Sequence, residues 1–168
     1  MTILFLDYDG VLHDAEVFIF GREPVLRSKN PKARLFDHAA LLVEALAPRP
    51  DVRIVLSTTW VPRLGFDRAK SYLPKALQAK VIGATYHRHA HGRKADWLSY
   101  ARFVQIESYV RRHQLNDWIA VDDDDQGWPV SMRQHLVFCQ NPSLGIADLE
   151  VFSELKRALL KSDPVPGG

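Results

Sequence analysis

The feature that most constrains the fold is a series of short apolar runs without strict alternation of apolar and polar residues. Runs of this kind are typical of strands that are covered on both faces of a sheet. The sequence predicts strands over residues 2–6, 52–56, 118–121 and 136–139, and a shorter one over residues 80–82. A chain with such strands buries most of its sheet between other elements.

Amphipathic helical patterns lie between and after these runs. Helices are predicted over residues 36–46, 103–113 and 146–160, where apolar side chains recur at helical spacing. Alternating strands and helices predict an α/β fold with a largely parallel sheet. We expect one domain over residues 1–161 and a flexible tail over residues 162–168.

Two polar, basic stretches fit neither pattern, and we predict loops there. Residues 13–34 carry Arg22, Arg27, Lys29, Lys32 and Arg34, and residues 86–94 carry Arg88, Arg93 and Lys94. Long loops in compact domains are often functional, and a plain solvated surface is the alternative. The second stretch also holds His87, His89 and His91, but no Cys or further His follows at the spacing of structural zinc sites.

Composition places the chain in a broad class without indicating its chemistry. The 168 residues are 46% apolar and 25% charged, which excludes general disorder. No apolar run is long enough to span a membrane, and the N-terminus lacks the basic start of a signal peptide. A single cysteine, Cys139, makes no intramolecular disulfide, so we expect a cytoplasmic protein. The net charge of +2 neither requires nor excludes an anionic partner.

Two carboxylates and a glycine follow the first predicted strand: Asp7, Asp9 and Gly10. Ligands of open α/β sheets gather at the carboxyl ends of strands, and residues i and i+2 of an extended segment project the same way. Two neighbouring carboxylates repel each other unless a cation or a proton neutralises one of them. The pair therefore indicates a metal or acid–base site, and an acidic turn that caps the next element is the alternative.

The string DYDGVL resembles the first motif of the haloacid dehalogenase (HAD) superfamily, and similar strings follow in the superfamily's order. RIVLSTTW ends with Ser57 and Thr58 near its strand end, like the second motif, and DWIAVDDDD resembles the fourth. Arg102, which opens RFVQIESYV, fits the basic third motif best, and Lys94 is the rival. The resemblance extends from residue 2 to about residue 124 and implies a Rossmann-like, three-layer HAD core.

A narrower resemblance connects the chain with the HAD domains of bacterial multidomain RNA-repair proteins. The strings that carry it are FLDYDGVLH, VLSTTW, RFVQIESYV and VFCQNPSLGI. The chain departs from that pattern in the spacing of Glu107 after Arg102, and in having Gly145-Ile146 where the family has Gly-Leu.

The superfamily resemblance implies a phosphohydrolase with defined roles for these residues. Asp7 attacks phosphorus and forms an aspartyl-phosphate, while Asp9 protonates the leaving oxygen and then activates water. Ser57 hydrogen-bonds a phosphoryl oxygen, and we expect Gly10 and Thr58 to contact substrate beside it. Arg102 or Lys94 balances the charge of the transferred group.

The same resemblance implies Mg²⁺, which favours oxygen ligands in octahedral geometry. Its protein ligands would be Asp7, the backbone carbonyl of Asp9, and Asp122 or Asp123. The sequence does not separate these last two, because the acidic run 122–125 holds more carboxylates than one ion needs.

The segments at residues 13–36 and 61–101 are too short for a large cap domain, so we expect a minimal cap or none and an open site. An open site accepts a large phosphorylated substrate, such as an RNA or DNA end, and Trp60 would then stack on a base or form an apolar lid. The alternatives are a phosphatase or phosphotransferase for small metabolites, and a non-catalytic phosphate-binding module. The Asp7/Asp9 pair argues against the last, because binding alone does not need the second acid.

Overall fold

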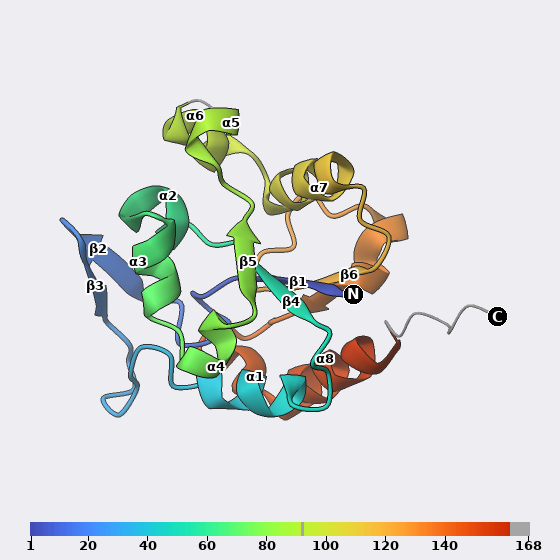
Figure 1. Ribbon diagram of the computed structural model, residues 1–168. Coiled ribbons are helices and arrows are strands. Elements are labelled where there is room, and N and C mark those ends of the chain that lie inside the picture. The colour runs from blue at the N-terminus through green and yellow to red at the C-terminus, as the bar shows by residue number, and fades with distance from the viewer. Residues whose placement is uncertain (92, 162–168) are drawn as a thin grey trace.

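The computed structural model contains a five-stranded parallel sheet with the strand order β5-β4-β1-β6-β7 (Figure 1). The structure describes residues 1–91 and 93–161. The strands are β1 Ile3–Leu6, β4 Arg53–Leu56, β5 Val81–Ala84, β6 Trp118–Asp122 and β7 Leu136–Phe138. Each predicted strand is present with its bounds shifted by at most two residues, and the predicted α/β class with a Rossmann-like core is confirmed.

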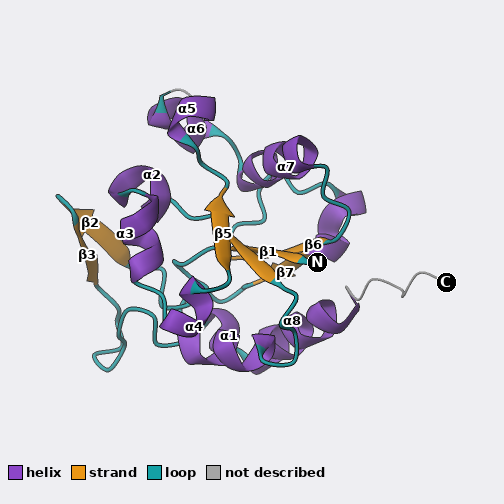
Figure 2. Cartoon of the chain, in the orientation of Figure 1, coloured by secondary structure: helices purple, strands orange, loops and turns teal. Residues whose placement is uncertain are grey.

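Helices cover both faces of this sheet, as the colouring by secondary structure in Figure 2 shows. The helices are α1 Ala39–Leu46, α2 Trp60–Leu64, α3 Phe66–Ser71, α4 Lys75–Gln78, α5 Arg88–His91, α6 Lys94–Ser99, α7 Arg102–His113 and α8 Leu149–Lys161, with 3-10 turns η1 Val130–His135 and η2 Gly145–Ala147. Helix α1 begins three residues later than predicted, after Phe36 has adopted a left-handed backbone with φ 61°. Helix α8 also begins later, because the 3-10 turn η2 precedes it.

The alternation of side chains along β1 divides the core into two layers. Leu4 and Leu6 pack in the larger cluster with α1 and α8, where Leu42 and Leu155 are fully buried. Phe5 points the other way and packs with residues of α7 in a second cluster. Burial of both faces explains why β1 is a continuous apolar run.

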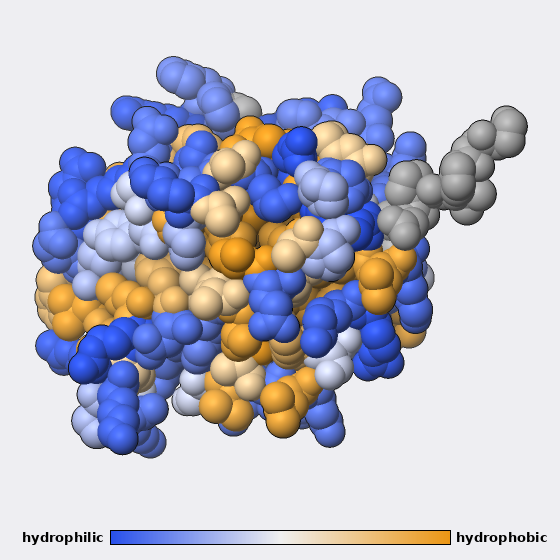
Figure 3. All heavy atoms as spheres, turned by 60° about the horizontal axis from the view of Figure 1, so that its bottom comes forward, coloured by the Kyte–Doolittle hydropathy of each residue, from blue (hydrophilic) through white to orange (hydrophobic). Residues whose placement is uncertain are grey.

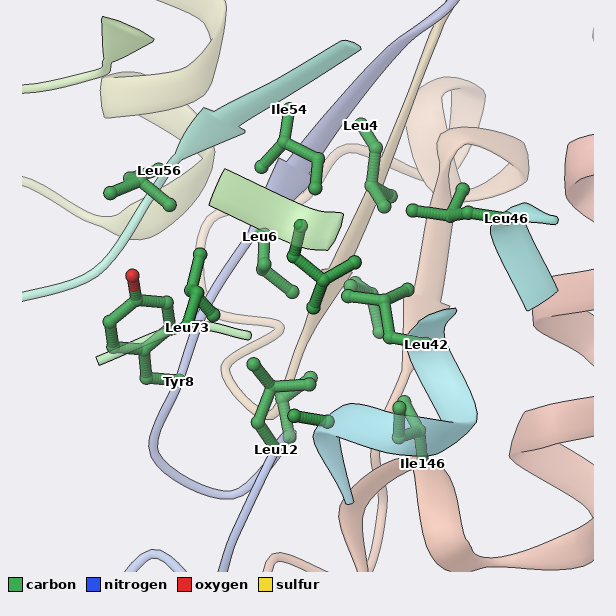
Figure 4. Packing of buried hydrophobic residues seen from close by; sticks show 14 of the residues in the cluster. Leu4, Leu6, Tyr8, Leu12, Leu42, Leu46, Ile54, Leu56, Leu73 and Ile146 are labelled. Atoms are coloured by element: carbon green, nitrogen blue, oxygen red, sulfur yellow. The ribbon is translucent and has the colours of Figure 1, made fainter. Parts of the chain in front are cut away.

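Figure 4 shows the larger cluster, in which side chains from the sheet and from α1 converge. Leu4, Leu6 and Ile54 of the sheet lie near Leu42 and Leu46 of α1. Each leucine buried in this way stabilises the fold by about 1.5–3 kcal/mol. This packing anchors the strands whose ends carry the acidic residues.

The loop prediction for residues 13–34 is wrong in part, because this stretch contains a hairpin of β2 Val17–Phe20 and β3 Glu23–Leu26. A two-residue turn joins the strands, and its first residue, Gly21, has a φ of 61°. Glycine at this position favours two-residue hairpin turns. The missed signal was the apolar run VFIF followed by Gly21.

The loop prediction for residues 86–94 is also wrong, because α5 lies within this stretch and α6 begins at its end. These helices, like α2, α3 and α4, have only four to six residues each. Helices this short have no stable periodic signal of their own and depend on packing. In Figure 2, α5 and α6 lie beyond the tip of β5.

On the face around α1, α4 and α8, apolar side chains form a band across the middle, with hydrophilic side chains around it (Figure 3). Among residues 1–91 and 93–161, no helix is both long and apolar enough to cross a membrane. The tail predicted over residues 162–168 lies outside the described residues.

Candidate active site

The site begins where β1 ends, at the edge of the sheet that the carboxyl ends of β4 and β6 share. The backbone N–H of Asp7 donates to the Val121 carbonyl at 3.2 Å, and the N–H of Ser57 donates to the Leu6 carbonyl at 2.8 Å. The sheet register therefore brings together three segments that lie far apart in the sequence. The Asp7 side chain is buried, and its Oδ1 accepts the N–H of Tyr8 at 2.8 Å.

Three carboxylates form the group that can hold a metal ion: Asp7, Asp122 and Asp123. One oxygen of each lies within 4.8 Å of the others. Asp122 is the last residue of β6, and Asp123 follows it at the rim. The structure thus brings both members of the Asp122/Asp123 pair to Asp7, while the side chain of Asp9 lies outside this group.

Burial raises the pKa of all three carboxyl groups above 3.8, because water no longer stabilises their charge. For Asp123 the pKa rises to about 7, with the neighbouring charge of Asp7 as the second cause. A bound cation would oppose both effects. The carboxylates therefore fit Mg²⁺, which prefers hard oxygen ligands.

Arg102, the first residue of α7, supplies a largely buried positive charge to the same cluster. Its Nε lies 3.0 Å from Asp122 Oδ2, and its Nη2 lies 3.5 Å from Asp7 Oδ2. Burial by itself would lower the pKa of Arg102, but the charges of Asp122 and Asp7 outweigh it and raise the pKa. Of the two basic candidates, the structure brings Arg102 to the carboxylates, whereas Lys94 is exposed at the start of α6.

The end of β4 presents the hydroxyl groups of Ser57 and Thr58. Ser57 is 1% exposed, and its Oγ has no hydrogen-bond partner among the described residues. A buried hydroxyl left in this way costs about 1–3 kcal/mol, so a phosphoryl oxygen at this position would satisfy it. A hydrogen bond from Thr58 lowers the pKa of Asp7, although burial and Asp9 keep that pKa raised.

Gly10 lies against Asp123, and no other residue fits its place. Its φ is 73°, and a Cβ atom built there would lie 2.1 Å from Asp123 Oδ2. The missing side chain therefore gives Asp123 room beside the first motif. The substrate contact expected for Gly10 remains a prediction.

The stacking interpretation of Trp60 is wrong, because the indole is 0% exposed and offers no face to a base. Tyr8, Phe36 and Tyr72 pack edge-on against it, which agrees with the apolar-lid alternative. Its Nε1 donates to Asp9 Oδ1 at 2.9 Å.

His13 also contacts Asp9, and sequence reasoning did not single it out. Its Nε2 lies 2.9 Å from Asp9 Oδ1. The available signal was a histidine four residues after an acid in a tight, glycine-containing turn.

The predicted basic segments have different surroundings. A cavity of about 930 Å³ adjoins α2, and its wall includes Arg88, Arg93 and Lys94 together with the aromatic Phe66 and Tyr86. It lies at the same edge of the sheet as the acids, because Tyr86 is the second residue after the end of β5, and the N–H of Thr85 donates to the Leu56 carbonyl of β4.

Two basic residues of the hairpin region make contacts close to the hairpin. The Arg27 guanidinium stacks on the rings of Phe18 and Phe20, and Arg22 donates to the Leu64 carbonyl at 3.3 Å. Of the two basic segments, the second contributes Arg88, Arg93 and Lys94 to the wall of the cavity, and the first contributes none of its residues. In the second segment the His87 and His89 rings lie 5.8 Å apart, while the side chain of His91 is outside the described residues.

Comparison with known families decides the classification. The model of the HAD domain in Swiss Army Knife RNA repair proteins matches residues 3–151, from the first residue of β1 into α8. The chain belongs to this family. Both predicted resemblances are thereby confirmed, and the match includes Asp7, Asp9, Ser57 and Arg102. No curated protein and no solved structure matches this HAD domain.

Family membership supports a HAD-type phosphohydrolase in general terms. HAD domains generally use Mg²⁺, and in this HAD domain Asp7, Asp122 and Asp123 supply suitable oxygen ligands.

Proposed function

We propose that this HAD domain is a magnesium-dependent phosphohydrolase that acts through an aspartyl-phosphate on Asp7. The observation that carries the proposal is the buried cluster of Asp7, Asp122 and Asp123, held by Arg102 beside the unpartnered Ser57 hydroxyl. If the acid cluster were purely structural, there would be no reason for a buried hydroxyl beside it, that of Ser57, to lack a hydrogen-bond partner among the described residues.

The reaction consists of two balanced displacements. In the first, a carboxylate oxygen of Asp7 forms a bond to phosphorus as the bond to the leaving oxygen breaks, and that oxygen takes a proton from Asp9. In the second, Asp9 takes a proton from water, the water oxygen bonds to phosphorus, and the Asp7–phosphorus bond breaks. Inorganic phosphate leaves, and both carboxyl groups return to their starting states.

Other residues stabilise charge during both displacements. Arg102 favours the ionised form of Asp7 and offsets the negative charge of the transferred group. Ser57 donates to a phosphoryl oxygen. When bound by Asp7, Asp122 and Asp123, with the Asp9 carbonyl as a further ligand, Mg²⁺ would lower the repulsion between the anionic nucleophile and the phosphate.

For the substrate, we propose the terminal phosphate of an RNA or DNA strand. The cavity beside α2 supports this, because Arg88, Arg93 and Lys94 suit a phosphodiester backbone, and Tyr86 and Phe66 suit bases. The description of the family as a domain of RNA repair proteins points the same way. We also propose a cytoplasmic location, in line with the single buried cysteine, Cys139.

A salt series tests this substrate. The kcat/KM is measured with Mg²⁺ for an end-phosphorylated oligonucleotide and for the matching mononucleotide. Each phosphate contact adds about 0.7 to the slope of log affinity against log salt for a single strand. A steeper slope and a preference for the oligonucleotide at low salt are expected.

The alternatives give different results in the same assay. Equal slopes and equal rates contradict the nucleic-acid substrate and indicate a phosphatase or phosphotransferase for small metabolites. If no phosphorylated compound is turned over in the presence of Mg²⁺, the domain is a non-catalytic phosphate-binding module.

A further inference from the structure

Two N–H groups converge on one oxygen of Asp9, the residue that carries the proton in the proposed reaction. His13 Nε2 lies 2.9 Å from Asp9 Oδ1, and Trp60 Nε1 lies 2.9 Å from the same atom. In the described part of the chain, Oδ2 of Asp9 accepts no such bond. The two oxygens of this carboxyl group are therefore held very differently.

The contacts of the His13 ring determine which nitrogen carries its proton. The backbone N–H of Phe36 donates to His13 Nδ1 at 3.1 Å, so Nδ1 is an acceptor. The proton of the neutral ring then lies on Nε2, which donates to Asp9. The ring is buried and packs edge-on against Phe36, so it cannot easily turn away.

Trp60 is held as firmly as His13. Tyr8, Phe36 and Tyr72 surround its ring at centroid distances of 5.1–5.4 Å, and its backbone N–H donates to Thr58 Oγ1 at 3.3 Å. The backbone of Trp60 is thus tied to Thr58, the second residue after the end of β4. The indole N–H acts only as a hydrogen-bond donor and does not transfer its proton to Asp9.

We propose that His13 and Trp60 are positioning residues that hold Asp9 by Oδ1 and leave Oδ2 as the oxygen that transfers the proton. This inference rests on the proposed phosphohydrolase function. As the bond between phosphorus and the leaving oxygen breaks, the proton passes from Oδ2 to that oxygen. The negative charge left on Asp9 is then shared with Oδ1, where two N–H donors stabilise it.

The test compares two esters that differ in the basicity of the leaving oxygen. 4-Nitrophenyl phosphate releases a stable phenolate that needs little protonation, whereas 4-nitrobenzyl phosphate has a similar ring and releases a basic alkoxide. The kcat/KM reports the first displacement alone, so a slow hydrolysis of the aspartyl-phosphate does not obscure the result.

Trp60→Phe keeps the aromatic packing and removes the N–H, and His13→Leu removes the second donor. Each variant should lose at least about 10-fold more kcat/KM on the benzyl ester than on the phenyl ester, since general acid catalysis contributes about 10²–10⁴-fold. His13→Gln, which offers an N–H near the place of Nε2, should recover part of that loss. Trp118→Phe is the control, because Trp118 is a buried tryptophan at the opposite end of β6.

NMR spectroscopy tests the contacts without turnover. The Trp60 indole N–H and the His13 ring nitrogens should shift in Asp9→Asn, and His13 Nδ1 should resonate as an unprotonated nitrogen in the wild type. If His13→Leu does not fold, as circular dichroism would show, Trp60→Phe and the NMR shifts still decide the question.

Equal losses on both esters, or an unchanged Trp60 indole resonance in Asp9→Asn, overturn the positioning role while the phosphohydrolase proposal stands. If the wild type hydrolyses neither ester with Mg²⁺, the proposed function fails, and the positioning role fails with it.

Discussion

The edge of the sheet that carries the acids and the segment between β5 and α7 hold their charges in opposite ways. Asp7 and Asp122 are buried, and both pair with Arg102, whose side chain is 10% exposed. Arg88 and Arg93 are exposed and line the cavity that adjoins α2. Buried charged groups have fixed positions and perturbed pKa values, which suits groups that take part in bond-making. Exposed cationic side chains can adjust their positions to an extended anion, and salt screens their attraction to it. In the proposed function, the buried groups therefore carry out the reaction, and the exposed segment binds the substrate strand.

The largest effect should come from Asp7→Asn, which replaces the nucleophile with an amide of nearly the same shape. Turnover of an aryl phosphate should fall by more than about 10³-fold, since removal of a nucleophile eliminates the covalent route. Initial rates measure this, and circular dichroism should show an unchanged fold. Turnover near the wild-type level would remove Asp7 from the role of nucleophile.

The next effect distinguishes Arg102 from Lys94. Arg102→Gln should lower aryl-phosphate kcat by about 10²–10³-fold. The substitution removes the fixed positive charge that offsets the negative charge of the transferred group. Lys94→Gln should leave this substrate near wild-type turnover, because Lys94 lies in the exposed segment. Similar losses of kcat in both variants would mean that Lys94 also takes part in the reaction and that the exposed segment does not serve recognition alone.

Gly10→Ala should weaken Mg²⁺ binding about 10–100-fold, the range found when the surroundings of a metal ligand change. The new methyl group would displace the Asp123 carboxylate. Gly21→Ala is the matched control, because Gly21 also has a positive φ but has open space around it. Titration calorimetry measures the affinity, and equal losses in both variants would attribute the effect to backbone strain alone.

Mg²⁺ should raise the Tm more at about pH 8 than at about pH 5. Burial raises the pKa of Asp123 from 3.8 to about 7, so in the metal-free protein the folded state holds this proton more tightly than the unfolded state. The free energy of unfolding therefore falls as the pH rises between these values.

Mg²⁺ binds the deprotonated carboxylates and so offsets this fall in the free energy of unfolding at higher pH. Thermal unfolding with Mg²⁺ and with a chelator measures the difference, and Asp123→Asn should reduce it. An equal Mg²⁺ shift at both pH values would place the metal away from the acids.

The smallest effect should come from changing the exposed segment. Replacing Arg88, Arg93 and Lys94 with Gln should leave aryl-phosphate turnover unchanged. For an end-phosphorylated oligonucleotide, it should reduce the salt slope by about 0.7 for each lost contact. The same changes at Arg53, Lys156 and Arg157, which do not line this cavity, are the control. An unchanged salt slope would mean that the residues of this cavity do not bind the oligonucleotide.

Much of the fold was predictable because its signals are local. Strands β1 and β6 are buried on both faces and read as uninterrupted apolar runs, and α7 begins within one residue of its prediction. The hairpin of β2 and β3 and the short helices α2 to α6 were missed, because strands and helices of about one turn depend on what they pack against.

The sequence by itself determined the parallel sheet, the spacing of Asp7, Asp9 and Gly10, and the family, because these depend on neighbouring residues. Only the tertiary structure decided that Arg102 reaches the acids, that Asp122 and Asp123 both join Asp7, and that Trp60 and His13 hold Asp9. The physical reason is that each of these contacts except that of His13 joins segments far apart in the chain. Their meeting depends on sheet register, and the His13 contact depends on the path of one tight turn.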